Sequence, residues 1–307
     1  MKVAVLCGGV GAARLLRGVI QLVSGPDLVA IVNVGDDTEL HGLHISPDLD
    51  TIVYTLAGAV SAERGWGLEG ETWQAMDMLA KYGGVDWFSL GDRDLGTHLY
   101  RTHRLREGAL LHEVSREIAA AWNLDLDLVP VTNDPLRTLV TTIDEGEIPF
   151  QEYFVRRHHD VVVTAVRFEG ASDALPAPGV LDALSLADRV IIAPSNPVVS
   201  IDPVLAVPGV SEALEARRDD VIAVSPIIGG KALKGPADRL LVELGREASS
   251  TAVAEWYRAV VGTLVIDVVD ADLAPAIEAL GVRCIVAPTI MSDPHTTADL
   301  ARRLLLP

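Results

Sequence analysis

Residues 3–34 read VAVLCGGVGAARLLRGVIQLVSGPDLVAIVNV, and their pattern is the strongest indication of the fold in the sequence. It opens with an apolar run at residues 3–7 that is typical of a buried strand, and a glycine-rich turn follows at 8–11. Apolar side chains then recur at helical spacing between residues 12 and 23, and a second apolar run occupies 28–34. A strand, a loop, a helix and a second strand within about thirty residues indicate a parallel βαβ unit.

The rest of the chain repeats this alternation. Further buried strands are predicted at residues 87–90, 189–193, 221–224, 264–268 and 283–286. Amphipathic helices are predicted at residues 47–60, 211–218, 237–244 and 251–261. Strands that alternate with helices favour an α/β fold, and we expect a doubly wound, mainly parallel sheet with a Rossmann-like three-layer core.

One segment departs from this alternation. Residues 139–143, the acidic turn DEGE at 144–147 and residues 148–155 predict a hairpin, and residues 161–168 predict a third antiparallel strand. We therefore expect a single α/β domain over residues 1–307, with a small β-rich lobe inserted at about 138–180.

The composition argues against several classes of function. A formal net charge of -18 and a pI near 4.7 disfavour binding to nucleic acids or to anionic membranes. Two cysteines form no disulfide framework, which suits a reducing compartment. No apolar run reaches the roughly 18 residues of a membrane span, and the first nine residues predict a strand rather than a signal peptide. We expect a cytoplasmic protein that acts on small molecules, with no nucleic-acid or membrane partner.

The first loop has the character of an anion site. Backbone N–H groups at a strand-to-helix turn, here formed by Gly8, Gly9, Val10 and Gly11, can bind phosphate. The pattern resembles a dinucleotide fingerprint, but Arg14 replaces the third small residue, and no Gly-Lys-Ser/Thr of a P-loop follows. The alternative is a tight turn that binds no ligand.

The segment SPDLDT at residues 46–51 allows two interpretations. Serine, proline and aspartate in this order are an ordinary helix start. In a helix, Asp48 and Asp50 lie about 200° apart and would not bind one ion together. Two carboxylates with substrate phosphates commonly hold Mg²⁺, so each aspartate needs a partner from another loop. The candidate partners are Asp36, Asp37, Asp92 and Asp94.

Two further loops carry polar side chains. The segment LGDRDLGTH at 90–98 follows the predicted strand 87–90 and presents Asp92, Arg93, Asp94 and His98. Loops at the carboxyl ends of strands bind ligands in open α/β sheets, and the alternative is a salt-bridged turn. In the segment PVTNDPLRT at 130–138, the side chains of Thr132, Asn133 and Asp134 are suited either to a polar wall of a pocket or to a turn with a cap.

Two loops in the second half complete the predicted site. Ser195 and Asn196 form a rigid polar turn between two prolines after the strand 189–193. The stretch SPIIGGKALKGP at 225–236 carries three glycines and two of the four lysines of the chain. With the glycine loop, these segments converge at one sheet edge and predict a nucleotide site. The candidates in the last segment are Ser225, Ile228, Gly229, Gly230, Lys231 and Lys234.

The remaining histidines and tryptophans carry weaker signals. His158 and its neighbour are expected on the surface of the lobe. Trp66 and Trp87 are suited to stack on a flat ring, but packing in the core is the default expectation.

In this order the motifs resemble the 2-phospho-L-lactate transferase family of coenzyme F-420 biosynthesis. The resemblance covers nearly the whole chain, from GGVGAAR through SPDLDT, LGDRD, TNDP and PSNP to SPIIGG. It implies transfer of a phospho-lactyl or phosphoenolpyruvyl group from a guanosine diphospho-donor to the deazaflavin Fo, with release of GMP. It also implies Mg²⁺ and a homodimer. Val10 departs from the pattern, because many archaeal relatives have threonine there, and this leaves the acid of the donor open.

The resemblance also assigns roles to residues. The loops at 8–11, 195–196 and 225–230 would hold the guanosine nucleotide, while 46–51 and 90–94 would approach the metal, the diphosphate and Fo. We expect Asp50, Asp92 and Arg93 to act in catalysis, and Asp48 and Asp50 to bind metal. Attack of an alcohol on a diphosphate needs positioning and charge neutralisation more than a covalent nucleophile, and no Ser–His or Cys–His arrangement is evident.

Two other functions fit parts of the sequence. A nicotinamide-dependent oxidoreductase would use Gly9, Gly11 and the acidic pair Asp36-Asp37 after the second strand. A nucleotide-binding regulator would use the same loops to bind a nucleotide but would catalyse no reaction. The oxidoreductase would leave the SPDLDT, PSNP and GGKALKG loops unused.

Overall fold

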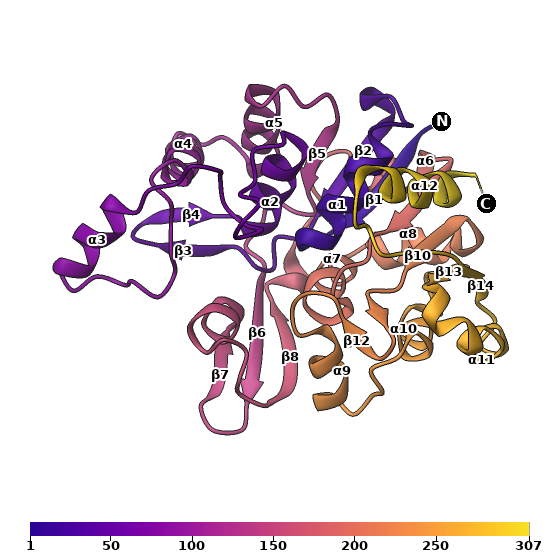
Figure 1. Cartoon of the computed structure of the whole chain (residues 1–307). Helices are drawn as coiled ribbons and strands as arrows, with labels where there is room; N and C mark the ends of the chain where they lie inside the picture. The colour runs from indigo at the N-terminus through magenta and orange to yellow at the C-terminus, as the bar shows by residue number, and fades with distance from the viewer. Residues whose placement is uncertain (307) are drawn as a thin grey trace.

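The core of the molecule is a seven-stranded, wholly parallel sheet in the order β14-β13-β10-β9-β1-β2-β5. Figure 1 shows the computed structural model, which describes residues 1–306. Nearly all side chains of the inner strands are buried, as expected for a sheet covered on both faces. The strands are β1 (Val3–Cys7), β2 (Leu28–Val32), β5 (Asp127–Pro130), β9 (Arg189–Ile192), β10 (Val221–Val224), β13 (Thr263–Ile266) and β14 (Arg283–Val286).

The strand order reverses beside β1. The chain runs outward from β1 through β2 to β5, then returns to place β9 on the other side of β1 and continues to β14. Adjacent loops therefore diverge above β1 and β9 and leave a crevice at their carboxyl ends, which is where open α/β sheets bind ligands. The predicted doubly wound α/β fold is confirmed.

Helices cover the sheet as the outer layers of a three-layer fold (Figure 1). Helix α1 packs against α2 and α12, and α6 packs against α8. No helix within residues 1–306 has the length and apolar character to span a membrane. The helices are α1 (Gly9–Val19), α2 (Pro47–Leu56), α3 (Gln74–Lys81), α4 (Asp94–Arg106), α5 (Leu111–Ala121), α6 (Val180–Leu186), α7 (Asp202–Leu205), α8 (Val210–Glu215), α9 (Ala237–Glu243), α10 (Ser250–Tyr257), α11 (Ala274–Ala279) and α12 (Pro294–Leu305).

A second, antiparallel sheet lies between β5 and β9 in the sequence. Its strands β6 (Arg137–Thr142), β7 (Gly146–Pro149) and β8 (Val163–Glu169) are ordered β7-β6-β8, as the predicted hairpin and third strand require. The strand predicted at 148–155 is wrong beyond Pro149, because Glu152–Arg156 form a π-helical turn. Phe150 and Tyr153, three residues apart, are both buried by this turn.

The strand predicted at 87–90 is also wrong. These residues pair with no strand, and Leu90 packs with Ile45 and Met76 in a small separate core. This small core lies by the hairpin of β3 (Thr38–Leu40) and β4 (Leu43–Ile45), which the sequence analysis did not predict. The edge position of the sheet is filled by β5 instead.

Candidate functional site

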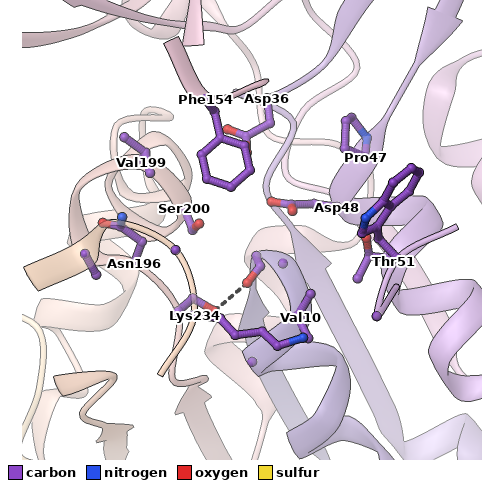
Figure 2. Close-up of a pocket in the computed structure, with 18 of the residues that line it drawn as sticks. Val10, Asp36, Pro47, Asp48, Thr51, Phe154, Asn196, Val199, Ser200 and Lys234 are labelled. Atoms are coloured by element: carbon purple, nitrogen blue, oxygen red, sulfur yellow. Dashed lines mark hydrogen bonds between the residues drawn. The ribbon is translucent and has the colours of Figure 1, made fainter. Parts of the chain in front are cut away.

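A cavity of about 860 Å³ opens at the carboxyl ends of β1, β9 and β10. Its wall includes the loop after β1, the start of α2, the turn after β9 and the segment after β10. Figure 2 shows Val10, Asp48, Asn196 and Lys234 around this space. The structure therefore brings together the three loops that were predicted to converge.

The glycines of the first loop allow close contact between backbones. A Cβ atom at Gly11 would lie 2.1 Å from the carbonyl oxygen of Pro194, and one at Gly8 would lie 2.6 Å from the Cβ of Ser200. The Ser195 hydroxyl donates to the Gly8 carbonyl over 2.7 Å. These contacts fix the loops after β1 and β9 against each other, so Gly8 and Gly11 are required by packing.

Two helix N-termini meet at Asp48. Helix α1 begins at Gly9, whose φ of 68° favours glycine, and the Asp48 carboxylate lies against it, with Oδ1 3.6 Å from where a Cβ of Gly9 would be. Pro47 begins α2 and places Asp48 in its first turn. Part of the anion-binding capacity predicted for the glycine loop is thus met by a side chain of the protein itself.

Asp36, Asp37 and Asp48 form what we call the acidic cluster. Burial, together with the neighbouring Asp37 charge, raises the pKa of Asp48 to about 7 against the opposing hydrogen bond from Asn33. Burial and the Asp48 charge raise the pKa of Asp36 well above its usual range. One oxygen each of Asp36 and Asp37 is buried without a hydrogen-bond partner in residues 1–306. Buried carboxylate oxygens that lack compensation are ligands suited to a divalent cation.

Asp50 belongs to a different group, with Asp94, His98 and Arg101. Arg101 is buried and donates to both carboxylate oxygens of Asp50, over 3.1 Å to Oδ2. His98 Nε2 lies 3.3 Å from Asp94 Oδ2 and its Nδ1 lies 3.6 Å from Asp50 Oδ2. Ligand atoms of Asp50, Asp94 and His98 lie within 4.8 Å of one another and could hold a metal ion. The guanidinium of Arg101 neutralises part of the charge of this group and would repel a cation. Of the acidic cluster, Asp36 and Asp48 line the cavity.

Asp92 and Arg93 do not line the cavity. The Asp92 carboxylate accepts hydrogen bonds from the Thr72 hydroxyl and from the backbone N–H groups of Gln74 and Ala75 at the start of α3. Arg93 donates to the carbonyl of Glu69. The prediction assumed a loop after a strand, whereas α4 begins at Asp94. The helix turns Asp94 and His98, four residues apart, toward the cavity instead.

The TNDP segment also lies outside the cavity wall. The Thr132 hydroxyl donates to the Leu175 carbonyl over 2.7 Å, and Asp134 accepts from the Leu175 N–H over 2.8 Å. Asn133 accepts from the backbone N–H of His112 near the start of α5. The structure assigns these three side chains to fixing the chain around β5.

The segment after β10 contributes only part of its predicted residues. Ser225, Ile228 and Lys234 line the cavity, while Gly229, Gly230 and Lys231 do not. The Gly229 N–H donates to the carboxylate of Asp270 over 3.0 Å. Lys234 reaches across the mouth of the cavity, so that a Cβ at Gly65 would lie 2.8 Å from its Nζ. Arg14 and Arg64 also line the cavity, and the side chains of Lys234 and Arg14 are exposed.

Aromatic side chains form part of the cavity wall, and two of them, Phe150 and Phe154, were not predicted from the sequence. Phe150 and Phe154 stack with ring centroids 5.4 Å apart, and Figure 2 shows Phe154 beside Asp36. Trp66, expected in the core, is 45% exposed and lines the cavity, as does Trp87. His158, expected on the surface, is exposed at the cavity rim. Aromatic rings recur every four residues at positions 150, 154 and 158, and this spacing was the sequence signal for an aromatic wall. A further missed segment follows β14 and comprises Thr289, Ile290, Met291 and Ser292.

Comparisons with known proteins agree with the resemblance seen in the motifs. Residues 3–290 match the family model described as 2-phospho-L-lactate transferase CofD. A Nocardia farcinica protein named phosphoenolpyruvate transferase is 46% identical over 99% of this chain and 94% of its own. A Streptomyces griseus protein of the same name is 43% identical over 99% of this chain and 98% of its own.

Solved structures agree on the fold. The crystal structure of protein BH3568 from Bacillus halodurans, also described as a member of the UPF0052 family, superposes with a TM-score of 0.66 at 18% identity. The match covers 99% of each chain. At this identity the likeness shows a shared architecture only, whereas the family model and the curated relatives carry the assignment. This chain belongs to the 2-phospho-L-lactate transferase CofD family, whose members act in coenzyme F-420 biosynthesis.

Proposed function

We propose that this protein transfers a phosphoenolpyruvyl group from a guanosine diphospho-donor to the terminal hydroxyl of the deazaflavin Fo, with release of GMP. Family membership supports the reaction class, and the names of the relatives favour phosphoenolpyruvate over phospholactate as the transferred acid. The observation that carries the proposal is one cavity lined by glycine-rich loops, acidic side chains and aromatic side chains. The homodimer and the cytoplasmic location remain predictions.

The donor would lie over the carboxyl ends of β1, β9 and β10. Backbone groups at Gly9, Val10 and Asn196 face the space that a nucleotide diphosphate would occupy. Arg14 and Lys234 supply positive charge at the cavity in a protein whose net charge is strongly negative. This arrangement supports local recognition of an anion without a positive global field.

The acidic cluster would hold the metal. Its unpartnered oxygens on Asp36 and Asp37 and the adjacent Asp48 fit a divalent cation that prefers oxygen ligands, and we propose Mg²⁺. Mg²⁺ bound there would neutralise the charge of the donor diphosphate. Asp50, held by Arg101, is thereby assigned to shaping the cavity wall rather than to binding metal.

The aromatic walls would hold the acceptor. Trp66, Phe154 and His158 offer flat faces at the cavity mouth, and stacking on a tricyclic ring suits them. In the reaction the acceptor oxygen bonds to the phosphorus that carries the acid, and the bond from this phosphorus to the bridging oxygen breaks. GMP leaves with that oxygen, and the hydroxyl proton passes to a carboxylate of the cavity.

Ligand titration tests the nucleotide assignment. Isothermal titration of the purified chain should show tighter binding of GDP or GMP than of ADP, AMP or NAD. NAD binding as tight as GDP would favour the oxidoreductase alternative instead.

A further inference from the structure

Asn33 lies beneath the acidic cluster and is completely buried. It follows directly after β2, and its backbone N–H donates to the Cys7 carbonyl over 2.9 Å, which ties it to the end of β1. It does not itself line the cavity. A polar side chain buried at the end of an apolar strand needs hydrogen-bond partners, and those of Asn33 all belong to cavity-forming segments.

The two ends of the Asn33 amide are distinguished by their partners. The Oδ1 atom accepts from the backbone N–H of Gly35 over 2.8 Å, so the Nδ2 group is the donor. Nδ2 donates to Asp48 Oδ2 over 2.9 Å and lies 3.5 Å from the Val199 carbonyl. One amide thus connects the turn after β2, the start of α2 and the turn after β9.

We propose that Asn33 is a positioning residue that orients the Asp48 carboxylate and the turn carrying Asp36 to bind a divalent cation. The proposal rests on the metal site of the proposed function. With Asp48 Oδ2 committed to Asn33, the carboxylate is held in one rotation. The other oxygen remains on the side of Gly9, 3.6 Å from where a Cβ of that residue would lie.

The Asp36 side of the cluster is fixed through the backbone. Asn33 holds Gly35, and a Cβ at Gly35 would lie 2.6 Å from the Thr138 hydroxyl and 3.0 Å from Asn33 Oδ1, so the turn is closely packed. Gln151 donates to the Asp36 carbonyl over 2.9 Å on the other side. Partners of this kind around metal ligands set ligand orientation, and their loss typically weakens metal affinity by about 10- to 100-fold.

The rival explanation is that Asn33 only satisfies buried polar groups. In that case its replacement would lower thermal stability without a selective effect on metal binding. Thr142 offers a matched control, because it is buried and its hydroxyl accepts from Glu145 N–H and donates to the Gly146 carbonyl in the turn between β6 and β7. Thr142 does not line the cavity.

The test uses Mn²⁺ as the probe, with unbound Mn²⁺ measured by electron paramagnetic resonance on the full chain. The parent protein should bind Mn²⁺, and Asp48→Asn should bind it far more weakly. Asn33→Leu should weaken the affinity about 10- to 100-fold, while Thr142→Val should leave it unchanged. Thermal unfolding in EDTA measures the structural cost of each variant. Asn33→Ser, which also removes the amide donor, replaces Asn33→Leu if that variant fails to fold.

Each other outcome has a defined meaning. Unchanged affinity in the Asn33 variants, with Asp48→Asn impaired, overturns the role of Asn33 and leaves the proposed function intact. Equal weakening in Asn33→Leu and Thr142→Val shows a structural effect and overturns it as well. Equal, weak binding by the parent and Asp48→Asn overturns the metal site itself, and the inference with it.

Discussion

The guanidinium of Arg101 donates to both carboxylate oxygens of Asp50, and both side chains are buried, with Asp50 in the wall of the cavity. Asp48, two residues before Asp50 on α2, belongs instead to the acidic cluster, in which Asn33 donates to Asp48 over 2.9 Å and Ser46 donates to Asp37 over 2.7 Å. The first turn of α2 therefore divides two neighbouring aspartates between a group that contains a buried guanidinium and the acidic cluster. This division explains why the metal is assigned to one of them and not to both.

Removing Arg101 should destabilise the protein strongly. Arg101→Met leaves the Asp50 carboxylate buried without its partner, which typically costs about 3–5 kcal/mol in the free energy of unfolding. Replacing both residues, as Asp50→Leu with Arg101→Met, should cost less than the sum of the single changes. Urea unfolding of the three variants measures this, and strictly additive losses would show that the pair is not coupled.

Lys234 should contribute to donor binding. Its side chain crosses the cavity mouth, and a charge-assisted hydrogen bond of about 1.5–3 kcal/mol implies that Lys234→Ala weakens GDP binding about 10- to 150-fold. Lys231 lies outside the cavity wall, so Lys231→Ala should change the dissociation constant by less than about twofold. Titration of GDP into both variants decides it, and equal small effects would assign phosphate binding to the backbone alone.

Two glycines should respond to alanine in opposite ways. Gly11→Ala forces a Cβ against the Pro194 carbonyl, so the loops after β1 and β9 must separate and the protein should lose stability and nucleotide affinity. Gly96 lies within α4 with open space around its Cα, and alanine there should stabilise by about 0.5–1 kcal/mol. Thermal unfolding compares the two variants. A harmless Gly11→Ala would disprove the packing requirement.

Asp202 should make stability depend on pH. Burial raises the pKa of Asp202 from 3.8 to about 7, although its hydrogen bond from Trp256 opposes the shift. The folded state then binds more protons than the unfolded state between these values, so this group lowers stability as the pH rises from about 4 to 7. Asp202→Asn keeps an acceptor for Trp256 and should be more stable than the parent at pH 8, with the gain shrinking toward pH 4. A difference in melting temperature that is constant with pH would contradict this.

The sequence predicted most of the sheet because each strand is a short apolar run set between helical patterns. It also predicted the convergence of Val10, Ser195 and Ser225, since carboxyl ends of parallel strands share one edge. The strand predicted at residues 87–90 was wrong because an apolar run indicates that a segment is buried but does not indicate which neighbours bury it. Here Leu90 is buried by Ile45 in a separate core.

The contacts that determine the chemistry of the site were harder to predict from the sequence. Asn33 is one polar residue in an apolar stretch, and its partners Asp48 and Val199 lie 15 and 166 positions away. The pairing of Asp50 with Arg101 spans 51 positions and requires a helix, α4, whose mixed His, Arg and Leu pattern gives no clear apolar stripe. Such contacts depend on how helices pack, which local patterns do not specify.

Mass spectrometry of the reaction products tests whether this protein transfers an acid-bearing phosphoryl group to Fo. The purified chain is incubated with Mg²⁺, Fo and either the phosphoenolpyruvyl or the phospholactyl guanosine diphospho-donor, with Asp48→Asn as the inactive control. We expect Fo that has gained the phosphoenolpyruvyl group, an equal amount of GMP, and little product with the phospholactyl donor. Unmodified Fo without GMP release from either donor would show that the proposed transfer is wrong.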